Sequence, residues 1–108
     1  MSADSVRLAQ SKQQQILVLE EYLNLYKQRL IEVETALRAL NKAKNSGEEF
    51  AFEILGANIL VKRNIDELIN ELNQEKDLLS KRIRSIEEQL VQLRKELREL
   101  VSKRPEGG

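Results

Sequence analysis

Two long seams of apolar residues constrain the fold of this chain more than any other feature. The first seam contains Ile16, Leu19, Leu23, Tyr26, Leu30, Val33, Leu37 and Leu40. The second seam, broken only by Lys76, contains Ile65, Ile69, Leu72, Leu79, Ile83, Ile86, Leu90, Leu93, Leu97 and Leu100. Alternating spacings of three and four residues place apolar side chains on one face of a helix that pairs with another helix. The sequence therefore predicts two long amphipathic helices.

Residues of the kinds that begin and end helices flank both seams. The first helix is predicted over residues 5–45, with Gly47 suited to the position just past its end. The second helix is predicted over residues 65–103, where Asn64 can cap its first turn and Glu67 completes a capping-box pattern. Arg104 and Pro105 are expected to end it.

The two predicted helices match in length, at about 40 residues or about 60 Å each. Equal helices joined by a short connection fold back on each other. Pairing Leu40 with Ile69 brings Ile16 opposite Leu93 and keeps both seams in register. The predicted fold is one mainly α domain, residues 1–108, built as a long antiparallel coiled-coil hairpin with both termini at its open end.

The connection, residues 49–63, has a β pattern instead of a heptad pattern. Phe50, Phe52 and Ile54 alternate with other residues and precede a Gly56-Ala57-Asn58 turn, after which a second short strand follows. A lone β-hairpin is marginal in water and leaves its strand edges unpaired. We expect the same segment of other subunits to close these edges into an inter-subunit β-barrel. The predicted assembly residues are Phe50, Phe52, Ile54, Leu55, Gly56, Ile59 and Val61.

Composition argues against several classes of protein. Lysine plus arginine and aspartate plus glutamate both number 18, so net charge gives no general attraction to nucleic acid or to an anionic membrane. The chain has no cysteine and no histidine, which removes the usual metal ligands and the commonest general base. No apolar run approaches the roughly 20 residues of a membrane span, and the first residues do not resemble a secretory signal. We expect a cytoplasmic protein that is not an enzyme and needs no cofactor or metal.

The order of these elements resembles a known family. FEILGANILVK, with its glycine between two short apolar strands, is followed by the Asn-capped NIDELINEL and a long seam of leucine and isoleucine. This pattern is similar to beta subunits of archaeal prefoldin. The resemblance implies a hexamer of two alpha and four beta subunits, in which coiled coils project from β-barrels. It also implies that the tips of the coiled coils hold non-native polypeptides without ATP and deliver them to a group II chaperonin.

The resemblance places client binding at the open end of the helical hairpin. The predicted tip residues are Val6, Leu8, Ala9, Leu17, Leu93, Leu97, Leu100 and Val101. Toward this end the positions of the first seam are occupied by Ala9, which precedes QSKQQQ, and by Lys12, which lies within it. Leucines of the second helix therefore face small or polar residues there. One alternative remains open at this stage, in which Leu93 and Leu97 are ordinary seam residues buried between the helices. QSKQQQ is interpreted as a solvated helical stretch that needs no function.

A different class of function also fits the pattern. A structural scaffold or adaptor could use the same helical hairpin as a spacer and dock its strands on another partner's sheet. Dependence of assembly on an alpha subunit separates the two hypotheses, because a scaffold has no need of that partner.

Overall fold

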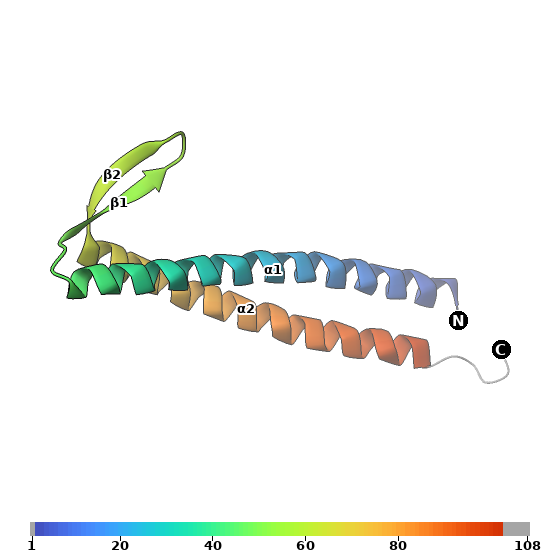
Figure 1. Ribbon diagram of the computed structural model, residues 1–108. Helices are drawn as coiled ribbons and strands as arrows, with labels where there is room; N and C mark the ends of the chain where they lie inside the picture. Colours follow the sequence, from blue (N-terminus) through green and yellow to red (C-terminus); the bar gives the residue numbers. More distant parts are fainter. Residues whose placement is uncertain (1, 103–108) are drawn as a thin grey trace. The chain divides into compact units, whose positions relative to one another are not determined.

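The structure, a computed structural model, describes residues 2–102 and is mainly helical (Figure 1). The elements follow in the order α1 (Ala3–Asn45), β1 (Phe50–Leu55), β2 (Ile59–Asn64) and α2 (Ile65–Ser102). Two long helices joined by a small antiparallel hairpin confirm the predicted fold class. The predicted last helical residue, Lys103, and the stop at Arg104 and Pro105 lie outside the described residues. Within residues 2–102 no helix is long and apolar enough to cross a membrane.

Helix α1 begins at Ala3, two residues before the predicted start at Ser5. The reason is a cap that the sequence pattern did not reveal. The Ser2 hydroxyl accepts a hydrogen bond from the backbone N–H of Ser5 at 3.1 Å, which satisfies one of the donors left free at a helix start.

The end of α1 follows the glycine that the sequence singled out. The N–H of Glu48 donates to the carbonyl of Ala43, and the N–H of Gly47 donates to that of Lys44, both at 3.0 Å. Gly47 has φ +90°, the left-handed conformation that this Schellman arrangement requires. The chain leaves the helix here and enters the β-hairpin, and the Lys44 ammonium lies 2.6 Å from the Asp66 carboxylate at the start of α2.

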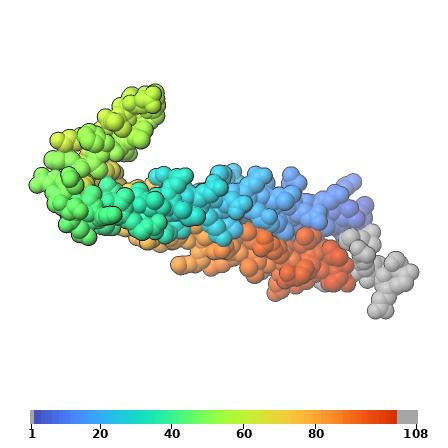
Figure 2. All heavy atoms as spheres, viewed as in Figure 1, coloured from blue at the N-terminus to red at the C-terminus, as the bar shows by residue number. Residues whose placement is uncertain are grey.

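The chain divides into two compact units. The terminal unit combines Met1–Lys27 with Lys81–Gly108, and the hairpin unit is Gln28–Ser80. In the terminal unit, Ile16 of α1 packs with Ile86 and Leu90 of α2, and Leu90 is buried almost completely. Figure 2 shows these two segments, blue to cyan and orange to red, lying against each other. Three ion pairs join α1 to α2 in this unit: Lys12–Glu96, Glu20–Arg94 and Lys27–Glu87. As residue numbers rise along α1, those of their partners in α2 fall, so the two helices are antiparallel.

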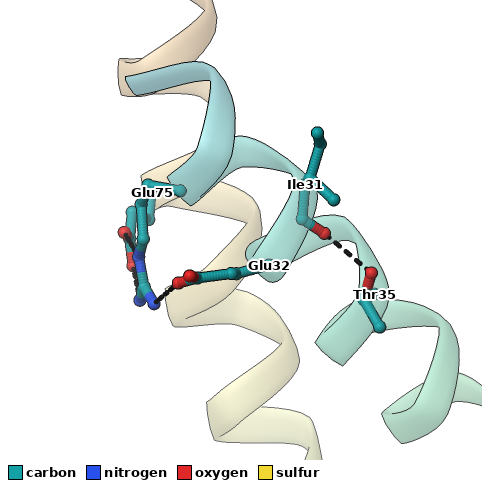
Figure 3. Close-up of polar contacts among 5 residues, drawn as sticks. Ile31, Glu32, Thr35 and Glu75 are labelled. Atoms are coloured by element: carbon teal, nitrogen blue, oxygen red, sulfur yellow. Dashed lines mark hydrogen bonds and ion pairs between the residues drawn. The ribbon is translucent and has the colours of Figure 1, made fainter. Parts of the chain in front are cut away.

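The hairpin unit contains the two strands and the adjoining parts of both helices. Its buried side chains are Val33, Leu37, Ile65, Leu68 and Leu79. Arg29 of α1 binds Glu75 of α2 through two parallel hydrogen bonds, Nε to Oε2 at 2.6 Å and Nη2 to Oε1 at 2.9 Å. Glu32 reaches the same guanidinium at 3.3 Å, and Figure 3 shows Glu32 and Glu75 both approaching it. Figure 3 also shows a separate bond within α1, in which the Thr35 hydroxyl donates to the Ile31 carbonyl.

Every apolar residue of the two predicted seams is buried or half-buried, and Lys76, the polar break, is half-buried. Leu68 is buried although it lies outside the seam. It stands three residues before Glu71, the carboxylate that binds Arg63 of β2. The base of the β-hairpin therefore reaches this side of α2, which a heptad pattern cannot indicate.

Candidate functional site

One face of the β-hairpin carries four exposed apolar side chains together with Lys62, whose ammonium lies 4.2 Å from the centre of the Phe50 ring, and Asn64. The pairing of Phe52 with Lys62 and of Ile54 with Leu60 fixes the register of β1 and β2. Because side chains alternate along a strand, Phe50, Phe52, Ile54 and Leu60 share one side. All four are exposed, Phe52 at 67% and Ile54 at 73%. We call these four residues the apolar strand face.

The opposite face of the hairpin is tied to α2 by a cation. The Arg63 guanidinium binds the Glu71 carboxylate at 2.6 Å and the Glu53 carboxylate of the neighbouring strand at 2.7 Å. The hydrogen bond to Glu71, with a second one to Glu53, raises the pKa of Arg63 above its ordinary value. Val61 lies on this face and is half-buried. The arrangement holds the hairpin by one side and leaves the apolar strand face open to solvent.

The structure assigns the predicted assembly residues of the second strand to a face. Ile59 and Val61 lie on the face opposite Phe52, and Leu60, which was not among the predicted residues, belongs to the apolar strand face. The turn decides this assignment, because Gly56, Ala57 and Asn58 all have positive φ and bring Leu55 opposite Ile59. Leu55 and Ile59 are exposed at the tip of the hairpin. The Gly56-Ala57-Asn58 turn, which the sequence indicates, is the signal that would have included Leu60, because a three-residue turn pairs Leu55 with Ile59 and therefore Ile54 with Leu60.

The start of α2 has the Asn64 cap that the sequence predicted. The Asn64 side-chain oxygen accepts a hydrogen bond from the N–H of Glu67 at 3.1 Å. The same asparagine ends β2, so the second strand passes into the helix without a loop. The N–H of Ile65 donates to the Glu49 carbonyl at 3.0 Å, which closes the base of the hairpin.

The predicted tip residues separate into two groups in the terminal unit. The exposed group is Val6, Leu8, Leu17 and Val101. Ala9 is buried, and Leu93, Leu97 and Leu100 are half-buried. Leu93 and Leu97 pack against the cluster of Ile16, Ile86 and Leu90. The second group therefore belongs to the packing between the helices, with part of each leucine still accessible.

A groove that the sequence did not indicate runs between α1 and α2 in the terminal unit. Its volume is about 660 Å³, and its lining residues are Ser11, Gln14, Gln15, Val18, Leu19, Gln89, Gln92, Leu93 and Glu96. Leu19 and Leu93 are half-buried, whereas the four glutamines are exposed. Part of the QSKQQQ stretch, which the sequence pattern predicts to be a solvated helical segment, thus lines a concave surface. We call this feature the glutamine groove.

Glu96, the charged residue lining the glutamine groove, is neutralised by a neighbour. Lys12 Nζ donates to Glu96 Oε2 at 2.6 Å, and Gln92 Nε2 donates to Glu96 Oε1 at 3.0 Å. The bond from Lys12, helped by that from Gln92, lowers the pKa of Glu96 below its ordinary value. The carboxylate is therefore ionised and paired at neutral pH, and the groove presents little net charge.

Comparisons with known proteins agree with this geometry. Residues 5–103 match the prefoldin subunit family. The fold is similar to the crystal structure of the prefoldin beta subunit from Thermococcus strain KS-1, with a TM-score of 0.77 and 22% identity, over 93% of this chain and 85% of that one. Among curated proteins no match was found. Members of the family are chaperone subunits that assemble with other prefoldin subunits. The chain therefore belongs to the prefoldin subunit family and has the fold of a beta-type subunit.

Proposed function

We propose that this protein is one of four beta-type subunits that assemble with two alpha subunits into a hexamer, which holds unfolded proteins in the cytoplasm without ATP and transfers them to a group II chaperonin. The observation that carries the proposal is the apolar strand face. Phe52, Ile54 and Leu60 are each more than 60% exposed on a two-stranded sheet with unpaired edges. Such a surface needs a partner that supplies both apolar contacts and backbone hydrogen bonds.

Strands of other subunits meet both needs. Adding a strand to each edge pairs the free N–H and C=O groups, and closing the sheet removes the edges altogether. With one hairpin in each of four beta subunits and two in each of two alpha subunits, the proposed hexamer has sixteen strands, enough for two barrels of eight. Leu55 and Ile59 at the hairpin tip add to the apolar surface that such a barrel would bury.

Exposed apolar residues of the terminal unit support client binding. Val6, Leu8, Leu17 and Val101 are at least 38% exposed. Burying one such side chain stabilises a complex by about 1.5 to 3 kcal/mol at most. One subunit would therefore bind an unfolded chain weakly, and several subunits acting on the same client would be needed for a useful affinity.

The proposal is tested by separating assembly from client binding. The intact chain and a variant lacking residues 1–10 and 98–108 are each mixed with an alpha subunit, and particle mass is measured by light scattering coupled to size exclusion. We expect both to form the hexamer. Each particle is then added to a chemically denatured client as it is diluted into buffer, and turbidity is followed without nucleotide. The intact hexamer should suppress aggregation, and the truncated one should lose most of that protection.

Two results would contradict the proposal. Full protection by the truncated hexamer would show that the predicted tip residues do not bind clients. Failure of the intact chain to assemble with an alpha subunit, together with no effect on client aggregation, would favour a scaffold that docks on another sheet. As a matched control, Val91→Ser removes an exposed apolar side chain that is not among the predicted tip residues, and it should protect as well as the intact chain.

A further inference from the structure

We propose that Lys62 selects the strand that pairs with the free edge of β2, and that it accepts a strand of a different subunit which places a carboxylate beside it on the apolar strand face. This inference rests on the proposed function, because it concerns the same assembly surface, and it names the chemistry of the partner at one edge. The occupant of that edge is an acidic strand and not a second copy of this chain.

The free edge of β2 presents the backbone of Lys62 to a partner. The N–H of Ile65 donates to the Glu49 carbonyl at 3.0 Å, so these residues form a hydrogen-bonded pair at the base of the hairpin. Hydrogen-bonded and non-hydrogen-bonded pairs alternate along an antiparallel ladder. In the register of β1 and β2, Phe52 and Lys62 therefore form a non-hydrogen-bonded pair, and the backbone groups of Lys62 point away from β1. The side chain opposite Lys62 on an added strand lies beside it on the same face.

The Lys62 ammonium needs an anion once this edge is covered. It is exposed and lies 4.2 Å from the centre of the Phe50 ring. Within residues 2–102 it forms no ion pair, whereas the adjacent Arg63 binds two carboxylates on the opposite face. A strand that covers the edge removes water from the ammonium, and the aromatic ring compensates for only a small part of that loss. A carboxylate on the incoming strand supplies the missing partner.

The strands of a second copy offer no suitable carboxylate. β1 and β2 contain one acidic residue between them, Glu53. Glu53 lies on the face opposite Phe52 and is held by Arg63 at 2.7 Å. Pairing the β2 edges of two copies would instead place two strands side by side that each carry Lys62 and Arg63 and no acidic residue. Like charges on neighbouring strands are destabilising.

An acidic residue before β1 of a second copy does not solve this problem. Glu48 has the same alternation as Phe50 and precedes the strand. An antiparallel copy that placed its Glu48 opposite Lys62 would pair only its Phe50 and Ala51 with residues of β2, and a parallel copy would pair Phe50 alone. Such a short overlap leaves most of the edge unpaired. Lys62 therefore favours a strand of a different subunit.

The experiment compares two kinds of assembly with the same full-length proteins. In the first, each protein is assembled with an alpha subunit, and the particle is diluted while mass photometry records the concentration at which half of it dissociates. In the second, each protein is studied alone, and its self-association is measured by sedimentation equilibrium. The test variant is Lys62→Met, which keeps an unbranched side chain and removes the charge.

We expect Lys62→Met to change the two assemblies in opposite directions. With the alpha subunit, methionine leaves the partner's carboxylate buried without a cation, so the concentration at half-dissociation should rise about tenfold or more. In the variant alone, the charge that hinders pairing of identical strands is gone, so self-association should occur at a lower concentration than for the intact chain. A general loss of hairpin structure would weaken both assemblies and would not give opposite signs.

Two control variants accompany the test. Lys62→Arg keeps a cation that can lie over the Phe50 ring, and it should retain most of the assembly with the alpha subunit. Lys81→Met removes an exposed lysine of α2 outside the strands, and it should change neither assembly. Circular dichroism should show equal helix content for all of these proteins, because none of the substitutions changes a buried residue.

An unchanged or tighter particle of Lys62→Met with the alpha subunit would overturn the inference, because no carboxylate would then depend on this lysine. Equal self-association of Lys62→Met and the intact chain would also overturn it, because Lys62 would not exclude a second copy. Failure of the proposed function gives a different result, in which the intact chain itself does not assemble with an alpha subunit or does not suppress client aggregation. The measurement of self-association needs no alpha subunit and tests Lys62 in either case.

Discussion

The hairpin unit and the terminal unit both expose apolar side chains, but they do so on different kinds of surface. In the hairpin unit, Phe52 and Ile54 stand on a strand whose edge groups require a partner strand in a fixed register. In the terminal unit, Val18 and Leu17 stand on a helix whose backbone hydrogen bonds are internal, and the groove beside them is lined in part by glutamine side chains. The first surface suits one defined partner. The second surface imposes no strand register on a partner, which is consistent with the proposed binding of unfolded chains.

The largest effect, loss of the hexamer, is expected from a substitution that disrupts the proposed assembly surface and leaves the helices intact. Phe52→Asp removes a large apolar side chain from the apolar strand face and places a carboxylate opposite Lys62, where a barrel would take both charged groups out of water. We expect the hexamer with an alpha subunit to be lost, with helix content by circular dichroism unchanged. Size exclusion coupled to light scattering measures the particle mass.

Ile31→Asp is the matched control for that prediction. Ile31 is 65% exposed, close to the 67% of Phe52, but it lies on α1 outside the strands. This variant should still assemble. If Phe52→Asp also assembled into a particle of full mass, the apolar strand face would not be the contact between subunits.

The next effect concerns the packing between the helices. Leu79 is 5% exposed and its neighbour Leu78 is 55% exposed. A leucine-to-alanine substitution can therefore be compared at a buried position and at an exposed one. Leu79→Ala should lower the free energy of unfolding by about 2 to 5 kcal/mol, and less where the structure collapses around the gap. Leu78→Ala should change it by less than about 0.5 kcal/mol. Urea denaturation followed by circular dichroism measures both, and equal midpoints would show that the seam assignment is wrong.

Much of this fold was predictable because its strongest signals are local and periodic. The spacing of three and four residues identified both helices, Gly47 and Asn64 marked their ends, and the alternation in β1 identified the apolar strand face. The positions that the sequence did not predict depend on contacts between segments. Leu60 needs the register that the turn sets, and Leu68 needs the base of the hairpin.

The glutamine groove shows the same limit at the candidate site. Gln14 and Gln15 lie more than 70 positions from Gln89 and Gln92 in sequence, and a heptad pattern describes only the faces that two helices turn toward each other. Which residues beside the two seams come close together depends on the offset of one helix along the other. A stretch such as QSKQQQ therefore reads as solvated from sequence, although part of it lines a concave surface in the structure.

A smaller effect is expected where the hairpin unit changes from helix to strand. Gly47 has φ +90°, and a Cβ at this position would meet nothing within 4 Å, so the cost of Gly47→Ala is backbone strain without a clash. We expect a loss of about 1 kcal/mol in unfolding free energy. Ser46→Ala, which removes only an exposed hydroxyl bond to the Lys42 carbonyl, serves as the control and should cost less. An unchanged stability for Gly47→Ala would mean that the helix ends in another conformation in solution.

The smallest effect is expected from the exposed ion pairs, which contribute less to the free energy of unfolding than the apolar seams do. The hydrogen bonds from Arg29, aided by its charge and opposed by partial burial, lower the pKa of Glu75 below its ordinary value. A carboxylate with a lowered pKa in the folded state stabilises the protein above its ordinary pKa, and this contribution is lost as the pH falls through the folded value. Both side chains are more than one third exposed, so solvent screening reduces the contribution to a few tenths of a kcal/mol, on the order of a surface pair.

The matching variant is Glu75→Gln, which keeps the shape of the side chain and removes its charge. At pH 7 the free energy of unfolding of the variant should be lower than that of the intact chain by a few tenths of a kcal/mol. This difference should shrink as the pH falls below the ordinary carboxyl pKa of about 4.3 and through the lowered pKa of the folded state. Glu32→Gln is the control, since Glu32 makes the longer contact of 3.3 Å to the same arginine and is 67% exposed. Urea midpoints at several pH values, each at low and high salt, measure the gap. A difference that did not shrink with falling pH would come from packing or hydrogen bonding and not from the charge of Glu75.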